Sequence, residues 1–204
     1  MCNETLLSKH NLQQTRLLKA AEVPALCERD VQRLAAKVDG LTLNPGNLVI
    51  AVLPTANLVS WLHARSEFYT SKLYGKTPEF KGSISDSADV WIYWHHDYRR
   101  GQLTIQRVSC PARADDDGTE SASEALASLL ADARNEAAAW NLSKVAMWDP
   151  TPEVDGALRH LSTKGITDEI VFKTERRGAV TMMRPYGGLS GKVIFETNEH
   201  YAWN

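Results

Sequence analysis

Apolar residues recur at the three-to-four-residue spacing of a helix in four segments of this chain. They predict helices over residues 1–40, 55–75, 121–140 and 151–164. The third helix is rich in alanine and is expected to bury one stripe against the rest of the protein. That stripe consists of Leu126, Leu129, Leu130, Ala133, Ala137 and Trp140.

Residues that start and stop helices stand at the ends of these segments. Pro24 suits a first turn, while Gly40 and Gly75 suit helix ends. Ser121 and Glu124 form a capping-box pattern, in which the serine caps the helix and the glutamate reaches back to it. The pattern predicts that the third helix starts at Ser121.

Shorter apolar runs, several with alternating polar positions, predict strands. The predicted strands cover residues 47–53, 90–94, 103–108, 144–148, 168–174, 179–184 and 192–196. Residues 76–88 contain Pro78, Gly82 and several serines, so they are expected to form a loop.

Strands that alternate with helices indicate a layered α/β or α+β fold, here a mixed sheet flanked by helices. We expect one domain over residues 1–204, in which residues 1–45 are a helical lead-in and residues 46–204 carry the sheet. From about residue 89 the order is strand, strand, long helix, strand, helix, strand, strand. That order resembles the central half of a GNAT acetyltransferase domain.

Composition and charge exclude several classes of partner. Of the 204 residues 43% are hydrophobic, and 23 Lys plus Arg stand against 25 Asp plus Glu, for a formal net charge of -2. This balance offers no basic surface to nucleic acid or anionic lipid, and no apolar run reaches the roughly 18 residues of a membrane helix. We expect a cytoplasmic protein without nucleic-acid or membrane partners.

Two groups of polar residues could carry chemistry but have simpler interpretations. His95 and His96 with Asp97 could bind a metal, yet neighbours on a strand point to opposite faces, so no metal site is predicted. His63 and Glu67 are four residues apart on a predicted helix and could act as a base and its orienting group. An ion pair on the helix surface is the interpretation that we favour.

The segment from Cys110 to Ser121 bears on cofactor binding. A GNAT domain holds the pyrophosphate of acetyl-CoA with backbone N–H groups of a glycine-rich loop at this point of the topology. Here the segment has one glycine and four acidic residues, which repel a pyrophosphate. No cofactor-binding residue is therefore predicted in this chain.

Several segments resemble the C-terminal region of the fungal lysine N-acetyltransferase family. The stretch from Glu136 to Pro150 matches best, and the ending from Val193 to Trp203 is similar to that family's Asn-Glu-x-Tyr-x-Trp ending. The predicted strands Val90–Trp94 and Leu103–Arg107 fit as well. The earlier stretch fits at Leu53, Pro54, Thr55, Trp61, His63, Arg65, Glu67, Lys81 and Gly82.

The resemblance implies an activity and a partner. Such enzymes transfer an acetyl group from acetyl-CoA to the side-chain amine of free L-lysine, at the start of a fungal lysine-degradation route. They combine an N-terminal GNAT domain, which holds acetyl-CoA, with a C-terminal part, and this chain resembles only the second. It is either a portion of a longer enzyme or a detached relative that is inactive alone. Acetyl-CoA and L-lysine are then its implied co-substrate and substrate.

The resemblance also implies where an amino acid would bind, although it assigns no catalytic residue. A GNAT-like sheet opens between its fourth and fifth strands, here residues 102–109 and 144–149. Free lysine needs a guanidinium for its carboxylate, and carboxylates or aromatic faces for its amines. The predicted substrate-binding residues are Arg107, Glu196, Asn198, Glu199, Tyr201, Arg65 and Glu67. Alternatively, Glu199 and Tyr201 only anchor the C-terminal strand.

A second function remains open. A chain with a GNAT-like fold and no cofactor loop could be a non-catalytic binding or interaction module. Its tryptophans would then form the core or a surface that pairs with an acetyltransferase domain or with a second copy.

Overall fold

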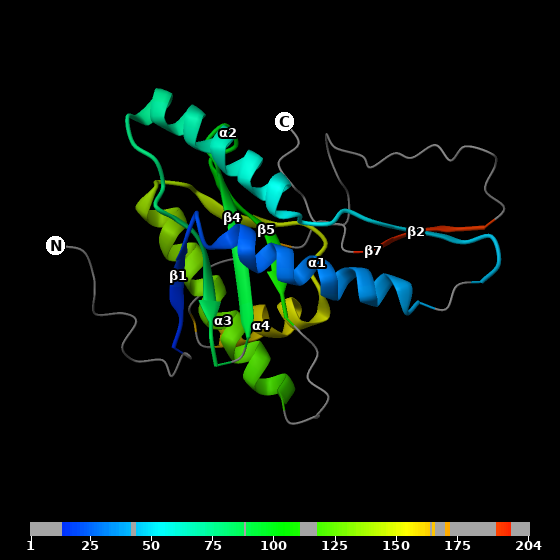
Figure 1. Cartoon of the computed structure of the whole chain (residues 1–204). Helices are drawn as coiled ribbons and strands as arrows, with labels where there is room; N and C mark the ends of the chain where they lie inside the picture. Colours follow the sequence, from blue (N-terminus) through cyan, green and yellow to red (C-terminus); the bar gives the residue numbers. More distant parts are fainter. Residues whose placement is uncertain are drawn as a thin grey trace.

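The computed structural model describes residues 14–41, 44–87, 89–110, 118–163, 165, 170–171 and 191–196 (Figure 1). Figure 1 shows a twisted sheet with helices on both faces and a two-stranded ribbon that extends to one side. The elements are β1 (Arg16–Lys19), α1 (Val23–Asp39), β2 (Leu48–Ala51), α2 (Ala56–Tyr74), β3 (Phe80–Ser85), β4 (Val90–Asp97), β5 (Gln102–Ser109), α3 (Gly118–Ala139), β6 (Lys144–Met147), α4 (Pro152–Thr163) and β7 (Val193–Glu196).

The main sheet has five strands in the order β1-β3-β4-β5-β6. The first four are antiparallel to their neighbours, whereas β6 runs parallel to β5 after the chain crosses over through α3. The register between β4 and β5 shifts between Tyr93 and Trp94, which marks a β-bulge. This mixed sheet with flanking helices confirms the predicted fold class.

Apolar side chains pack on both faces of the sheet. Trp94 and Leu103 lie on the face that α3 and α4 cover, and they join the larger core cluster. Trp91 and Tyr93 lie on the opposite face, against residues of α1 and α2. Because both faces are covered, the central strands β4 and β5 are buried almost throughout.

A second sheet joins two distant parts of the chain. β2 and β7 run parallel, with Leu48 paired to Val193 and Ala51 to Glu196. The amide of Lys192 donates to the side-chain oxygen of Asn47 at 2.9 Å and extends the pairing. Of the tail strands that the sequence predicts, residues 192–196 are confirmed as β7. Residues 179–184 and most of 168–174 lie outside the described residues.

The predicted helix ends are largely confirmed. α1 has Pro24 in its first turn and ends at Gly40. At the start of α2 the Thr55 hydroxyl accepts the amide of Leu58 at 3.3 Å, and Gly75 ends the helix in the left-handed conformation, with φ at 67°. The buried stripe of α3 is confirmed too, from Leu126 to Ala137, although Trp140 is half-buried at its edge.

Two predictions near the N-terminal side of the sheet are wrong. Residues 16–19 were expected to be helical but form β1, an edge strand whose four residues are too few to show a period of their own. Residues 76–88 were expected to be a loop but contain β3, which lies between β1 and β4. A Cβ on Gly82 would stand 2.4 Å from the carbonyl oxygen of Ile92, so the glycine permits close strand pairing and is no loop signal.

The start of the long helix also differs from the prediction. α3 begins at Gly118, so Ser121 lies inside its first turns and is not its cap. Residues 111–117, which include most of the acidic segment, lie outside the described residues.

Candidate functional site

Arg107, the first predicted substrate residue, is held in a buried ion pair. Its Nε donates to Asp30 Oδ2 at 2.6 Å, and the Ser109 hydroxyl donates to the other carboxylate oxygen of Asp30 at 2.9 Å. Asp30 lies on the sheet-facing side of α1, and it and Arg107 are almost fully buried. The pair therefore ties α1 to β5.

The predicted C-terminal cluster is only partly described. Glu196 ends β7, and its carboxylate is paired with the ammonium of Lys37 on α1. Asn198, Glu199 and Tyr201 lie outside the described residues. Glu196 is thus paired with Lys37 of α1, and Arg107 is paired with Asp30 of the same helix.

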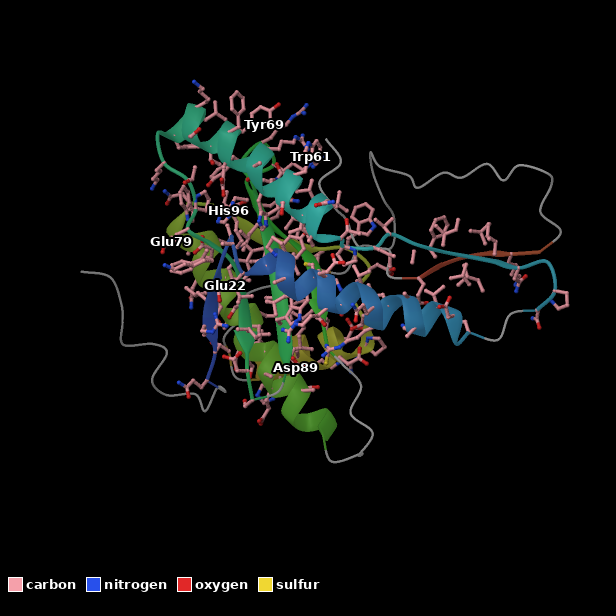
Figure 2. All side chains as sticks on the ribbon, in the orientation of Figure 1. Glu22, Trp61, Tyr69, Glu79, Asp89 and His96 are labelled. Atoms are coloured by element: carbon pink, nitrogen blue, oxygen red, sulfur yellow. The ribbon has the colours of Figure 1, made fainter. Side chains whose placement is uncertain are left out.

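Arg65 and Glu67 lie on α2 beside a buried polar region. The Arg65 guanidinium stands over the ring of Trp61 at 5.7 Å and that of Tyr69 at 5.9 Å. Trp61 and Tyr69 are exposed on the outer side of α2 (Figure 2). Glu67 is half-buried, and its charge acts on the pKa of Lys81 on β3.

The buried polar region, here named the Lys81 cluster, consists of His63, Lys81, His95, His96 and Glu136. Two helices and two strands contribute to it: α2 supplies His63, α3 supplies Glu136, β3 supplies Lys81, and β4 supplies His95 and His96. Lys81 precedes Gly82, which pairs with Tyr93, so it stands beside the part of β4 that lies opposite the bulged residue of β5. Its side chain is 0% exposed, and no hydrogen-bond partner reaches its Nζ.

Burial and mutual repulsion set the protonation of the cluster. Burial lowers the pKa of Lys81 to about 8, against the opposing charges of Glu67 and Glu136. Burial and then the Lys81 charge lower the pKa of His63 and of His95 to about 4. At neutral pH Lys81 is therefore mainly an ammonium, and these two imidazoles are neutral.

His96 links the Lys81 cluster to α3 and to a group of aromatic side chains. Its Nε2 lies 2.9 Å from Glu136 Oε1, and burial lowers its pKa although Glu136 opposes the shift. Its ring stacks on Tyr98 at 6.0 Å and meets the edge of Trp140 at 5.5 Å. Lys76 closes the group on the outside, with its Nζ 4.4 Å from the centre of the Trp140 ring. In Figure 2, His96 lies below α2 in the view.

His95 and His96, which are neighbours on β4, face opposite sides of the sheet. His96 contacts Glu136 on α3, whereas the pKa of His95 is influenced by Arg65 on α2. Among the residues that the structure describes, no three His, Cys, Asp or Glu side chains are grouped so that they could hold a metal ion.

The surface ion pair expected for His63 is wrong. His63 lies on the inner side of α2, 8% exposed, with its ring edge against Tyr93 at 5.9 Å. It is buried because Val59, Leu62 and Ser66 share its helix face and place that face on the sheet. Sequence reasoning missed Lys81 because β3 reads as a loop. The one signal for Lys81 in the sequence is that Lys81 and Gly82 fit the pattern of the lysine N-acetyltransferase family.

Comparison with known protein families fits this geometry. The family model described as the LYC1 GNAT-like C-terminal domain matches residues 3–204. The chain belongs to this family. The antiparallel strands, together with the parallel strand β6 that follows the α3 crossover, are thus the sheet of a GNAT-like domain. The role of the chain is related to that of acetyltransferases. Comparisons with curated proteins and with solved structures gave no match. No helix within the described ranges is long and apolar enough to cross a bilayer.

Proposed function

We propose that this chain is the substrate-side part of a lysine N-acetyltransferase that acts in the cytoplasm in fungal lysine degradation. The reaction moves an acetyl group from acetyl-CoA to the side-chain amine of free L-lysine. The observation that carries the proposal is the family match over residues 3–204, together with the β4-β5-α3-β6 arrangement. A GNAT-like sheet with a parallel crossover strand is what that match leads one to expect.

The composition of the segment between β5 and α3 does not fit the pyrophosphate of acetyl-CoA. The stretch from Cys110 to Ser121, which leads from β5 into α3, has one glycine and four acidic side chains. A pyrophosphate needs clustered backbone N–H groups and positive charge, and acidic side chains repel it. We infer that a separate N-terminal acetyltransferase domain holds acetyl-CoA, and that this chain is inactive alone.

We propose that the substrate binds beside α2. Of the residues predicted for this role, Arg65 and Glu67 lie next to the Lys81 cluster, while Arg107 and Glu196 are paired with Asp30 and Lys37. Arg65 offers a guanidinium and Glu67 a carboxylate, which are the groups that an amino acid requires. Asn198, Glu199 and Tyr201 are retained as predicted contacts of the same substrate.

Activity measurements on a two-part enzyme test the proposal. The chain is joined to the acetyl-CoA-binding domain of another member of the family, and acetyl-lysine is measured by mass spectrometry. We expect product only when both parts are present. If the folded fusion forms no acetyl-lysine while its acetyl-CoA-binding domain binds acetyl-CoA, the proposed function is wrong.

The same fusion tests the substrate residues. We expect Glu67→Gln to lower kcat/KM for lysine at least tenfold, which is about 1.4 kcal/mol of transition-state binding. Glu153→Gln, at an exposed position on α4, is the matched control and should leave kcat/KM unchanged. Glu199→Gln and Tyr201→Phe are measured alongside, and wild-type kinetics in both would leave those residues with a structural role.

A second candidate function, a non-catalytic interaction module, is favoured by the outer face of α2. Exposed aromatic and apolar side chains line it, and such patches mark protein contacts. They are Trp61, Phe68, Tyr69, Leu73 and Tyr74, with Trp61 57% exposed. Sedimentation of the chain alone and with the acetyltransferase domain tests this candidate. Association that Phe68→Ser weakens, without acetyl transfer in the fusion, would support it over the enzyme.

A further inference from the structure

The outer side of α2 carries large side chains that recur every three or four residues. A helix places residues at this spacing on one side, and here that side points away from the sheet, because Val59, Leu62 and Thr70 occupy the inner side. Tyr74, the last residue of α2, is set apart by its contact with Tyr98, at 4.5 Å between ring centres. The outer set, here named the α2 stripe, consists of Trp61, Arg65, Phe68, Tyr69, Lys72 and Leu73.

The apolar members of the α2 stripe are largely exposed. Trp61, Phe68 and Tyr69 are 57%, 61% and 54% exposed, and Leu73 is 68% exposed. The inner side of the same helix is apolar as well, and a helix that is apolar on more than one side is typically buried on each of them. Exposed apolar patches mark contact surfaces. A second surface is therefore expected over the stripe.

The order of the residues along the α2 stripe suits a second copy of the same helix. In an antiparallel pair with a two-fold axis at the level of Glu67, position 61 faces position 73 of the other copy. Trp61 of each copy then meets Leu73 of the other. Phe68 lies one residue from the axis, so the two Phe68 rings meet beside it. The apolar part of the stripe therefore complements itself.

The charges of the α2 stripe favour the antiparallel arrangement. The stripe holds two cations, Arg65 and Lys72, and a parallel pair would place each of them opposite its own copy. In the antiparallel pair Arg65 faces Tyr69 of the second copy, and Lys72 lies near Trp61 of that copy. The Arg65 guanidinium already stands over the Trp61 and Tyr69 rings of its own helix, and aromatic faces attract such a cation. Cations thus meet rings across the axis.

The area of the α2 stripe matches the lower end of specific interfaces. An aromatic side chain carries about 150–250 Å² of surface, so four large side chains that are more than half exposed offer on the order of 400 Å² per copy. Two copies then bury about 800 Å², and the stems of Arg65 and Lys72 bring the total towards the roughly 1,000 Å² of a specific interface. An interface of this size predicts a weak dimer.

We propose that two copies of this chain associate through the α2 stripe as an antiparallel pair with two-fold symmetry. This association goes beyond the proposed function and does not depend on acetyl transfer. It is compatible with the role proposed for Arg65, because the rings contact the faces of the guanidinium and leave its N–H groups for a substrate carboxylate.

Analytical ultracentrifugation of the full chain, over micromolar to millimolar concentrations, tests the proposal. We expect a monomer–dimer equilibrium with a dissociation constant in the micromolar range, and Phe68→Ser should weaken it at least tenfold. Val171→Ser, at an apolar position that is 60% exposed and lies outside α2, is the control and should dimerise as the wild type does. Unfolding midpoints establish that each variant is folded.

A mixing experiment tests the antiparallel arrangement. Trp61→Lys and Leu73→Glu each place a charge opposite an apolar side chain of the second copy, so each variant alone should dimerise at least tenfold more weakly. In a mixed dimer the new lysine of one variant faces the new glutamate of the other, while the remaining Trp61 and Leu73 still meet. We expect the mixture to associate at least tenfold more tightly than either variant alone.

Three outcomes would overturn the proposal. A chain that stays monomeric at every concentration has no second copy on the stripe, and binding of an acetyltransferase domain that Phe68→Ser weakens would assign the stripe to that domain. Dimerisation that Phe68→Ser leaves unchanged uses another surface. A mixture that associates no better than its components excludes the antiparallel pair. Because none of these measurements involves acetyl-lysine, the dimer and the proposed function fail separately.

Discussion

At the scale of single residues, burial of ionisable groups is the dominant feature of this protein. His63 and His95 are held far from the pH at which an exposed histidine titrates, and Lys81 keeps its charge without a bonded partner. Such groups make stability depend on pH, because protons bind the folded and unfolded states differently.

Acid should destabilise the protein through His63. Its pKa is about 4 in the folded state against 6.5 in the unfolded state, so protons bind the unfolded state preferentially below pH 6.5. The stability is fully present above pH 6.5 and is lost as the pH falls towards 4. Between pH 6.5 and 5 we expect a loss of about 1–2 kcal/mol from this residue. Urea unfolding at both pH values should show a smaller loss in His63→Gln, and an equal loss in both proteins would contradict the assignment.

Trp140 should stabilise the fold despite being only half-buried. It packs against the larger core cluster and contacts His96, Tyr98 and Lys76. Full burial of a tryptophan makes its truncation cost about 3–5 kcal/mol, so Trp140→Ala should cost about 2–4 kcal/mol. Trp61→Ala, at an exposed position, should stay within about 0.5 kcal/mol. An unchanged unfolding midpoint in Trp140→Ala would show that the contacts of Trp140 do not stabilise the folded state.

At the scale of elements, α1 is fixed to the sheet by charge as well as by apolar contact. Asp30 and Arg107 are buried together, at 4% and 9% side-chain exposure. Removing one charge of a buried pair leaves the other without compensation, which costs far more than the loss of a surface pair.

We expect Asp30→Leu to destabilise the protein by about 3–5 kcal/mol. The double variant Asp30→Leu with Arg107→Met should recover most of that loss, because it removes both charges. Arg33→Ala breaks an exposed pair with Asp89 and should cost no more than about 1 kcal/mol. Chemical unfolding of the four proteins is the measurement, and a double variant as unstable as the single one would contradict the argument.

The elements also show what the sequence can predict. α2 is recognisable because Thr55 and Gly75 mark its ends and a helical period lies between them. β3 is not recognisable, since Gly82 and its serines give no apolar alternation and are buried only in the folded protein, by the strands on both sides and by α3, where Ser83 donates to Asp132. The Lys81 cluster and the Asp30–Arg107 pair could not be predicted from the sequence for a similar reason. Lys81 lies in that strand, and Arg107 meets Asp30 across 77 residues, a distance at which no local pattern reports a contact.

At the scale of the whole molecule, the chain should not bind acetyl-CoA tightly. The acidic segment after Cys110 stands at the point of the sequence, between β5 and α3, at which a GNAT domain has its phosphate-binding loop. Calorimetric titration of the chain alone should give no saturable heat in the micromolar range, whereas the fusion with an acetyl-CoA-binding domain should bind. A micromolar dissociation constant with defined stoichiometry for the chain alone would contradict the expectation.

The pairing of β2 with β7 is expected to form late in folding, because it joins distant parts of the chain. The bond between Asn47 and Lys192 joins residues 145 positions apart, and closing such a loop costs about 4 kcal/mol of chain entropy. β3, β4 and β5 follow one another along the chain and meet through short turns, so they form early. The Lys81 cluster can therefore assemble before β2 and β7 pair. Until β7 pairs with it, the edge of β2 that β7 covers in the folded protein is also open, and strands of other molecules can add there.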